Sequence, residues 1–156
     1  KGRAEIVPIN KNFTVMIDYA HTPDGLRNIL SCVREITKGK VIVVFGCGGD
    51  RDKSKRAEMG KIAGEMSDVA VVTSDNPRNE NPLLIINDIL CGMEKSKARI
   101  AVIENRRQAI EFALEKARKN DLVLLAGKGH EVCQIVGNEK IPFDEREIIK
   151  EYFNGF

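Results

Sequence analysis

The sequence predicts a single α/β domain in which a mostly parallel sheet is covered by helices on both faces. Two observations carry this prediction: short apolar runs that suit buried strands alternate with segments in which apolar residues recur at helical spacing. The chain has 156 residues, 42% of them hydrophobic, which is enough to fill one core. We therefore expect one Rossmann-like domain over residues 1–156, with an edge hairpin towards its C-terminal end.

Five segments are predicted to be strands because they are apolar almost without interruption, as parallel strands buried on both faces are. Residues 15–17 (VMI), 41–45 (VIVVF), 69–72 (VAVV) and 122–125 (LVLL) have this character. Residues 100–103 (IAVI) are a shorter candidate. These segments are the expected strands of the parallel sheet.

Four helices are expected between these strands, because apolar residues recur there every three or four positions. In chain order the four stripes are Leu26-Ile29-Leu30-Val33, Met59-Ile62-Ala63-Met66, Ile85-Ile86-Ile89-Leu90 and Ile110-Ala113-Leu114-Ala117. Thr22 before Pro23 and Asn81 before Pro82 are typical of helix starts, since a capping side chain is followed by a proline at the first helical position. Strand and helix therefore alternate along the chain.

The C-terminal part of the sequence predicts a hairpin and a last helix. Residues 132–136 and 140–141 flank the turn dipeptide Gly-Asn at 137–138, which is typical of a β-hairpin. Asp144 and Glu147 have the spacing of a capping box, so we expect the last helix to begin there.

Composition excludes several classes of partner. Twenty-five basic and 23 acidic residues give a formal charge of +2, and aromatic residues make up 5%, which argues against nucleic-acid binding. No apolar run reaches the roughly 20 residues of a membrane span, and no signal-like segment follows the charged start, so we expect a cytoplasmic protein with no membrane partner. Two histidines and four isolated cysteines predict no metal site.

Four polar segments, two of them rich in glycine, follow predicted strands, namely residues 18–21, 46–55, 74–81 and 126–131. Parallel sheets bind ligands beyond the carboxyl ends of their strands, because the connecting loops meet there. We therefore expect these four segments to converge on one rim of the sheet.

The glycine-rich segment 46–51 (GCGGDR) matches no complete nucleotide motif. A dinucleotide fingerprint requires its third glycine where Arg51 stands. A P-loop reading fails because Asp52 precedes Lys53, and because residues 127–129 (GKG) lack the Ser or Thr that must follow the lysine. The glycines are equally consistent with a tight strand-to-helix turn, but that reading does not explain the charges beside them.

Residues 74–78 (SDNPR) place a carboxylate, an amide and a guanidinium around a proline that stiffens the turn, an arrangement that suits a zwitterion. Arg78 could hold a carboxylate through two parallel hydrogen bonds while acidic groups receive an ammonium. The alternative is a simple turn with a surface arginine. On the segment 126–131, Glu131 is expected to face the same rim, whereas His130 is more readily explained by a structural hydrogen bond than by acid–base chemistry.

Taken together, five ordered motifs resemble the Mur ligase family over essentially the whole chain. They are residues 2–5 (GRAE), 18–26 (DYAHTPDGL), 46–56 (GCGGDRDKSKR), 75–78 (DNPR) and 127–131 (GKGHE). The resemblance is to the carboxy-terminal domain of the member that adds the third amino acid to UDP-N-acetylmuramoyl-L-Ala-D-Glu. Five motifs in order are far more specific than any one of them.

The resemblance implies an ATP-dependent peptide ligase of peptidoglycan biosynthesis, in which the carboxylate of the UDP-linked dipeptide becomes an acyl phosphate and the amine of meso-diaminopimelate attacks it. This domain would bring the amino acid. In the family, ATP and Mg²⁺ are held mainly by the central domain, and the third-residue ligases that use lysine usually lack the arginine of the DNPR motif. The matched positions that would bind meso-diaminopimelate are Arg51, Asp75, Asn76, Pro77, Arg78, Gly127 and Glu131. Those that would lie towards the nucleotide are Arg3, Asp18 and His21.

The same resemblance predicts what the chain does not contain. Residues 1–12 would form the junction to the central ATPase domain, and neither that domain nor the N-terminal UDP-binding domain is represented, so we expect no ligation by the chain alone. Ser54 and Ala57 replace a glycine and a proline usual in the family, and both can start or continue a helix. Two alternatives remain: a free-standing α/β module that binds a small ligand, and a nicotinamide-dependent oxidoreductase.

Overall fold

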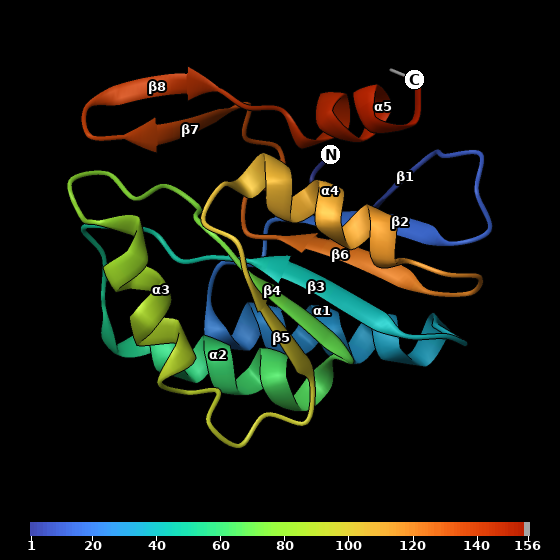
Figure 1. Cartoon of the computed structure of the whole chain (residues 1–156), viewed down its shortest axis with the longest axis horizontal. Helices are drawn as coiled ribbons and strands as arrows, with labels where there is room; N and C mark the ends of the chain where they lie inside the picture. The colour runs from blue at the N-terminus through green and yellow to red at the C-terminus, as the bar shows by residue number, and fades with distance from the viewer. Residues whose placement is uncertain (155–156) are drawn as a thin grey trace.

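The structure is a computed structural model and describes residues 1–154. A six-stranded sheet in the order β1-β2-β6-β3-β4-β5 forms its centre, and all neighbouring strands are parallel except β1 and β2 (Figure 1). The strands of this sheet are β1 (Glu5–Val7), β2 (Thr14–Asp18), β3 (Val41–Phe45), β4 (Val69–Val72), β5 (Arg99–Val102) and β6 (Leu122–Ala126). The predicted parallel α/β architecture is confirmed.

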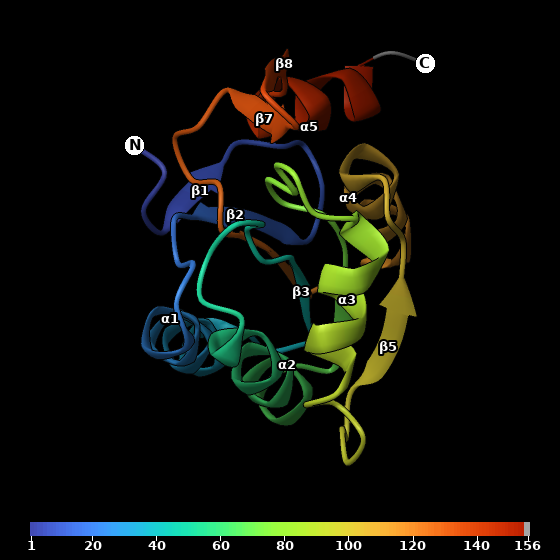
Figure 2. The same cartoon turned by 90° about the vertical axis from the view of Figure 1, so that its left-hand side faces the viewer.

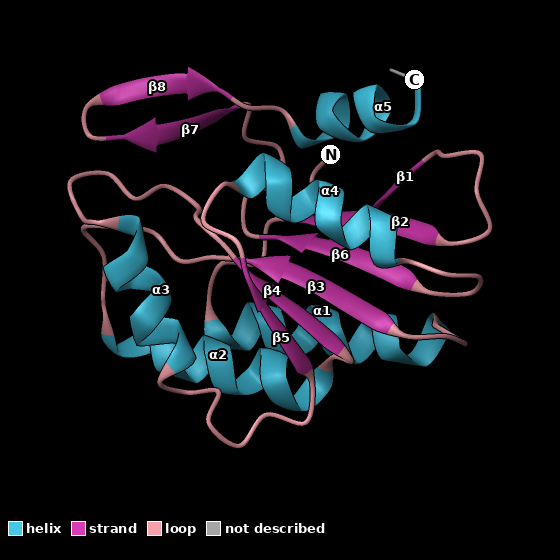
Figure 3. Cartoon of the chain, in the orientation of Figure 1, coloured by secondary structure: helices cyan, strands magenta, loops and turns pink. Residues whose placement is uncertain are grey.

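Helices cover both faces of the sheet, as predicted, and Figure 3 shows the helices in cyan on either side of the magenta strands. The helices are α1 (Pro23–Ile36), α2 (Ser54–Met66), α3 (Pro82–Leu90), α4 (Arg106–Lys116) and α5 (Glu145–Asn154). The first three lie on one face, and α4 and α5 lie on the other (Figure 1). Within residues 1–154, no helix has the length and apolar character needed to cross a membrane.

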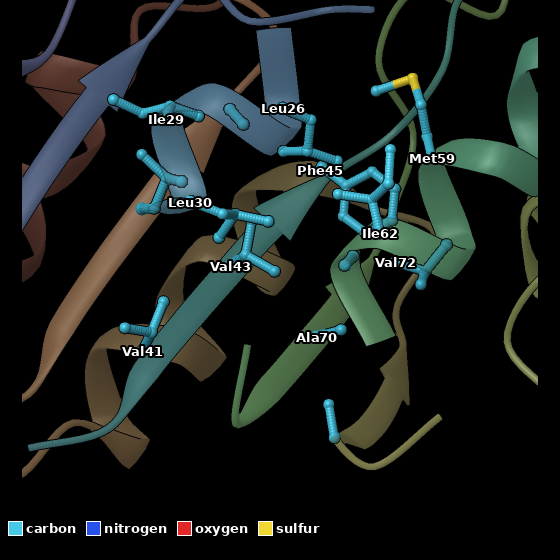
Figure 4. Packing of buried hydrophobic residues seen from close by; sticks show 14 of the residues in the cluster. Leu26, Ile29, Leu30, Val41, Val43, Phe45, Met59, Ile62, Ala70 and Val72 are labelled. Atoms are coloured by element: carbon cyan, nitrogen blue, oxygen red, sulfur yellow. The ribbon is translucent and has the colours of Figure 1, made fainter. Parts of the chain in front are cut away.

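Alternation along each strand divides the core into two layers. On β3, Val41, Val43 and Phe45 pack against α1 and α2, as Figure 4 shows. Ile42 and Val44 point to the opposite face and pack with α4 and α5. Because all five side chains are essentially inaccessible to solvent, β3 is a central strand buried on both faces, which explains its uninterrupted apolar sequence.

Capping side chains start the helices where the sequence predicts. The hydroxyl of Thr22 accepts a hydrogen bond from the backbone of Gly25, and the Asn81 side chain accepts one from Leu83. At α5 the prediction is met in part: the Asp144 carboxylate accepts from the Arg146 backbone amide, as a cap requires.

Two elements differ from the expectation. The strands β7 (Cys133–Val136) and β8 (Glu139–Pro142) form the predicted hairpin, but as a separate two-stranded sheet beside the main sheet rather than as an extension of its edge. The edge is taken instead by β1, a strand within residues 1–12 that the sequence did not predict. The hairpin contacts the loop after β4 through a bridge between Arg78 and Val136 and through hydrogen bonds from Gln134 and Ile135 to Asp75 and Asn76.

Candidate amino-acid site at the rim of the sheet

A pocket lies at the carboxyl ends of the parallel strands, where the sequence predicts that the polar loops converge. Figure 2 looks onto this end of the sheet. The cavity has a volume of about 340 Å³, which is within the range of small-molecule sites. It is lined by Tyr19, His21, Thr22, Cys47, Gly48, Arg51, Asp52, Lys55, Arg56, Met59, Asp75, Asn76, Arg78, Gly127 and Glu131. All four predicted loops therefore contribute to one site.

The loops after β3 and β4 are locked together by their backbones at Gly49. The amide of Gly49 donates to the carbonyl of Asn76 at 2.8 Å. A Cβ atom at position 49 would lie 1.9 Å from the carbonyl oxygen of Pro77, so a side chain cannot be accommodated without moving a loop. Glycine is required here for close approach of two backbones rather than for binding a phosphate.

Arg78 is fixed at both its backbone and its side chain. Its backbone adopts φ 50°, in the left-handed region, and is held by hydrogen bonds from its amide to the Ile135 carbonyl and from the Gly137 amide to its own carbonyl. Its Nη1 donates to the carbonyl of Gly49 at 2.9 Å. Within residues 1–154, no hydrogen bond engages Nε or Nη2, so these donors remain for a ligand in the cavity that Arg78 lines.

The acidic side of the pocket is built around a lysine that sequence reasoning missed. Asp75 and Asn76 are almost completely buried, Glu131 is partly buried, and all three line the cavity. The ammonium of Lys128 lies 2.9 Å from Oδ1 of Asn76 and 3.3 Å and 3.4 Å from carboxylate oxygens of Asp75 and Glu131. The sequence signal that could have identified it is a lysine between two glycines immediately after a wholly apolar strand.

A second buried cation supports the loop after β3. The Arg56 side chain is 2% exposed and donates to the Gly48 carbonyl and to the carboxylates of Glu80 and Asp88. The hydrogen bond from Arg56, together with one from the Asp50 amide, lowers the pKa of Glu80 to about 2. Glu80 therefore stays ionised and ties the start of α3 to the glycine-rich loop.

The three residues predicted to lie towards a nucleotide differ in their position relative to the cavity. His21 lines the cavity, whereas Arg3 and Asp18 do not. Both oxygens of Asp18 accept hydrogen bonds from backbone amides, those of Ala4 and Ala20, so this carboxylate holds the segment around β1 in place. The guanidinium of Arg3 lies 6.0 Å from the centre of the Tyr19 ring.

Across residues 1–154, no cluster of three or more His, Cys, Asp or Glu side chains has metal-binding geometry. Neither glycine-rich loop has the sequence of a P-loop, and the carboxylate of Asp18 is already occupied by backbone amides.

The pocket thus brings together most of the residues expected to bind the amino acid. Those that line it are Arg51, Asp75, Asn76, Arg78, Gly127 and Glu131. Pro77 does not line it; its carbonyl lies where a side chain of Gly49 would be, so its contribution is to the packing of the loops. The ligand-binding roles of these residues remain a prediction.

The fold and the pocket define a class: an α/β domain with a cavity at the carboxyl ends of its strands that is lined by both positively and negatively charged side chains. Residues 2–129 match the family model described as Mur ligase, glutamate ligase domain. The chain belongs to the Mur ligase family, and the resemblance stated from the motifs is confirmed.

Relatives with high identity agree with this assignment. The chain is 56% identical over 151 residues to the UDP-N-acetylmuramoyl-L-alanyl-D-glutamate--2,6-diaminopimelate ligase of Caldanaerobacter subterraneus subsp. tengcongensis, covering 97% of this chain and 31% of that protein. It is 55% identical over 152 residues to the ligase of the same name from Clostridium botulinum, covering 96% of this chain and 31% of that one. The chain therefore spans about a third of the length of these relatives.

A solved structure of a UDP-N-acetylmuramoyl-L-alanyl-D-glutamate--2,6-diaminopimelate ligase superimposes with a TM-score of 0.93 at 36% sequence identity. The superposition covers 99% of this chain and 32% of that one. A solved domain of a ligase from Haemophilus ducreyi, matched over 98% of both chains with a TM-score of 0.62 at 13% identity, shares the fold. The fold predicted from the sequence is thus that of known Mur ligases.

Proposed function

We propose that this chain is the amino-acid-binding domain of an ATP-dependent ligase that adds meso-diaminopimelate to UDP-N-acetylmuramoyl-L-Ala-D-Glu. The observation that carries the proposal is the placement of charge in one cavity: Arg51 and Arg78 line it together with the carboxylates of Asp75 and Glu131. A ligand held by both sets of groups needs a carboxylate and an ammonium close together. The distal end of meso-diaminopimelate has both.

The free N–H donors of the pocket arginines suit a ligand carboxylate better than a neutral ligand group. Arg78 has its Nη1 anchored to the Gly49 carbonyl, which leaves the Nε and Nη2 side of the guanidinium for two parallel hydrogen bonds. Arg51 is exposed on the same wall and adds positive charge. L-Lysine lacks the distal carboxylate and would leave Arg78 without an anionic partner, which costs on the order of 1 to 3 kcal/mol or more for a charged donor. The pocket is therefore expected to select against lysine.

Catalysis would require more than this chain. Activation of the dipeptide carboxylate by ATP supplies the acyl phosphate, and ATP and Mg²⁺ would be bound mainly by the central domain of the ligase. The role of the residues described here is to hold the attacking amino acid in a fixed orientation, and the proposed nucleotide-side residue His21 lines the same cavity. The proposed partners are that domain, the UDP-linked dipeptide and meso-diaminopimelate.

The test is substrate choice in the ligase that contains this chain. We expect Arg78→Ala to reduce the preference for meso-diaminopimelate over L-lysine, expressed as the ratio of their kcat/KM values, by at least tenfold. Arg27→Ala, which removes an exposed arginine on α1 outside the cavity, is the matched control and should leave the ratio unchanged. A preference that survives Arg78→Ala contradicts the proposal, as does ligation by residues 1–156 alone.

A further inference from the structure

Lys128 lies directly behind the pocket but does not line it. Its side chain is completely buried, which is rare for a lysine unless buried partners compensate its charge. The partners are Asn76, Asp75 and Glu131, and each of these lines the cavity. One buried ammonium thus holds three pocket side chains that come from two separate loops.

The contact with Asn76 fixes which end of its amide can reach a ligand. Oδ1 of Asn76 accepts from Nζ of Lys128 at 2.9 Å and from the backbone amide of Ile135 at 3.0 Å. These two donors occupy both lone pairs of the oxygen. Rotating the amide by 180° would place its NH₂ group against two donors and lose both hydrogen bonds. Asn76 is therefore left with its NH₂ group, a donor, for a ligand in the pocket.

The contacts with Asp75 and Glu131 set the charge on the other side of the pocket. Lys128 lies 3.3 Å and 3.4 Å from one oxygen of each carboxylate. Two carboxylates and one ammonium leave a net charge of −1, which matches a single ammonium group on a ligand. The second oxygen of each carboxylate remains available to accept hydrogen bonds from that group.

We propose that Lys128 is a positioning residue that determines the polarity of the amino-acid site. It holds Asn76 as a hydrogen-bond donor beside Arg78, where a ligand carboxylate would bind. It holds Asp75 and Glu131 as acceptors, where a ligand ammonium would bind. This inference rests on the proposed function and deepens it, because it assigns selectivity for a zwitterionic end group to a residue that does not touch the ligand.

The first test is Lys128→Met in the ligase that contains this chain. We expect KM for meso-diaminopimelate to rise at least tenfold, kcat to change by less than about threefold, and the preference for meso-diaminopimelate over L-lysine to fall at least tenfold. Lys61→Met, an exposed lysine on α2 outside the cavity, is the control. A purely structural role would lower the amount of folded enzyme without changing the preference, so an unchanged preference overturns the proposal.

Asn76→Asp keeps the test decisive if Lys128→Met does not fold. Aspartate has the same shape and retains the partner of Lys128, but it places an oxygen where the NH₂ group stands. We expect at least a tenfold loss in kcat/KM for meso-diaminopimelate and a smaller loss for L-lysine. Retained selectivity in this variant overturns the proposal for Lys128 while leaving the proposed function intact. If the wild-type ligase does not take up meso-diaminopimelate, the proposed function itself fails and this inference with it.

Discussion

The guanidinium of Arg106 lies 2.9 Å from the carboxylate of Glu145, and neither side chain is exposed to solvent. The remaining nitrogens of Arg106 donate to the carbonyls of Ser74 and Ala126. These carbonyls lie where the chain leaves β4 and β6, immediately before the two loops that carry the acidic side of the pocket. A buried ion pair behind the sheet therefore holds the origins of both loops at a fixed separation.

Removing one partner of this pair is expected to be costly. Arg106→Met would leave the buried carboxylate of Glu145 without compensation and two carbonyls without donors, so we expect the free energy of unfolding to fall by about 3 to 5 kcal/mol. Urea denaturation measures this change. Arg107→Met, the neighbouring arginine whose pair with Glu151 is exposed, should cost under about 1 kcal/mol. Equal losses in the two variants would contradict the role given to Arg106.

The carboxylates of Glu5 and Glu80 predict how stability depends on pH. Hydrogen bonds from Arg146 and from the Gly2 amide lower the pKa of Glu5 to about 2, and those from Arg56 and the Asp50 amide do the same for Glu80. A carboxylate whose pKa is lower in the folded state stabilises that state at any pH above its ordinary value near 4.5, and this stabilisation is lost as the pH falls towards 2.

We therefore expect Glu80→Gln to reduce the loss of stability on acidification from about pH 5 to about pH 2, because one of the responsible groups no longer titrates. Melting temperatures over this range measure the effect. Glu35→Gln, which replaces an exposed glutamate on α1, should follow the wild-type curve. Parallel curves for Glu80→Gln and the wild type would show that the Arg56–Glu80 contact does not persist in solution.

Substituting Gly49 tests whether the packing of the two loop backbones positions Arg78, without changing any charge in the pocket. In Gly49→Ala the new Cβ would collide with the Pro77 carbonyl, and the displaced loop would carry away the carbonyl that anchors Nη1 of Arg78. We expect at least a tenfold weaker affinity for meso-diaminopimelate, measured by calorimetry on the folded ligase.

Gly25→Ala is the control for this variant. The nearest atoms to its Cβ would be the Thr22 hydroxyl at 3.0 Å and Ala20 Cβ at 3.5 Å, neither of them a backbone carbonyl, and alanine favours the helix that begins there. If Gly25→Ala and Gly49→Ala bind equally well, the backbone contact between the two loops does not position Arg78.

The fold was predictable from the sequence because its central strands are buried on both faces. The run 41–45 has no polar residue, since neither face of β3 meets water. The strand β1 was not predicted, because three residues on an antiparallel edge carry almost no periodic signal. The hairpin packs against the distant loop that carries Asn76 and Arg78, and no local pattern encodes such contacts.

The sequence predicted the residues of the site only where the strand topology alone determines which loops meet. Parallel strands place their following loops at one rim, so Arg78 and Glu131 could be expected to share a pocket. The buried cations Lys128 and Arg56 could not be expected, because a charged side chain is buried only when partners distant in sequence compensate it. Asp18 shows the reverse case: a carboxylate suited to ligand chemistry that the fold uses for its own backbone.

Cys47 predicts a difference in thiol reactivity within the chain. It lines the cavity, but burial, reinforced by the negative charge of Asp75, raises the pKa of its thiol to about 12. Since the thiolate is the reactive form, alkylation by iodoacetamide near pH 8 should be at least tenfold slower at Cys47 than at the exposed Cys32 and Cys91. Peptide mass spectrometry over a time course measures the three rates, and labelling in concentrated urea, where the difference should vanish, is the control. Equal rates in the folded chain would show that the wall of the pocket around Cys47 opens to solvent.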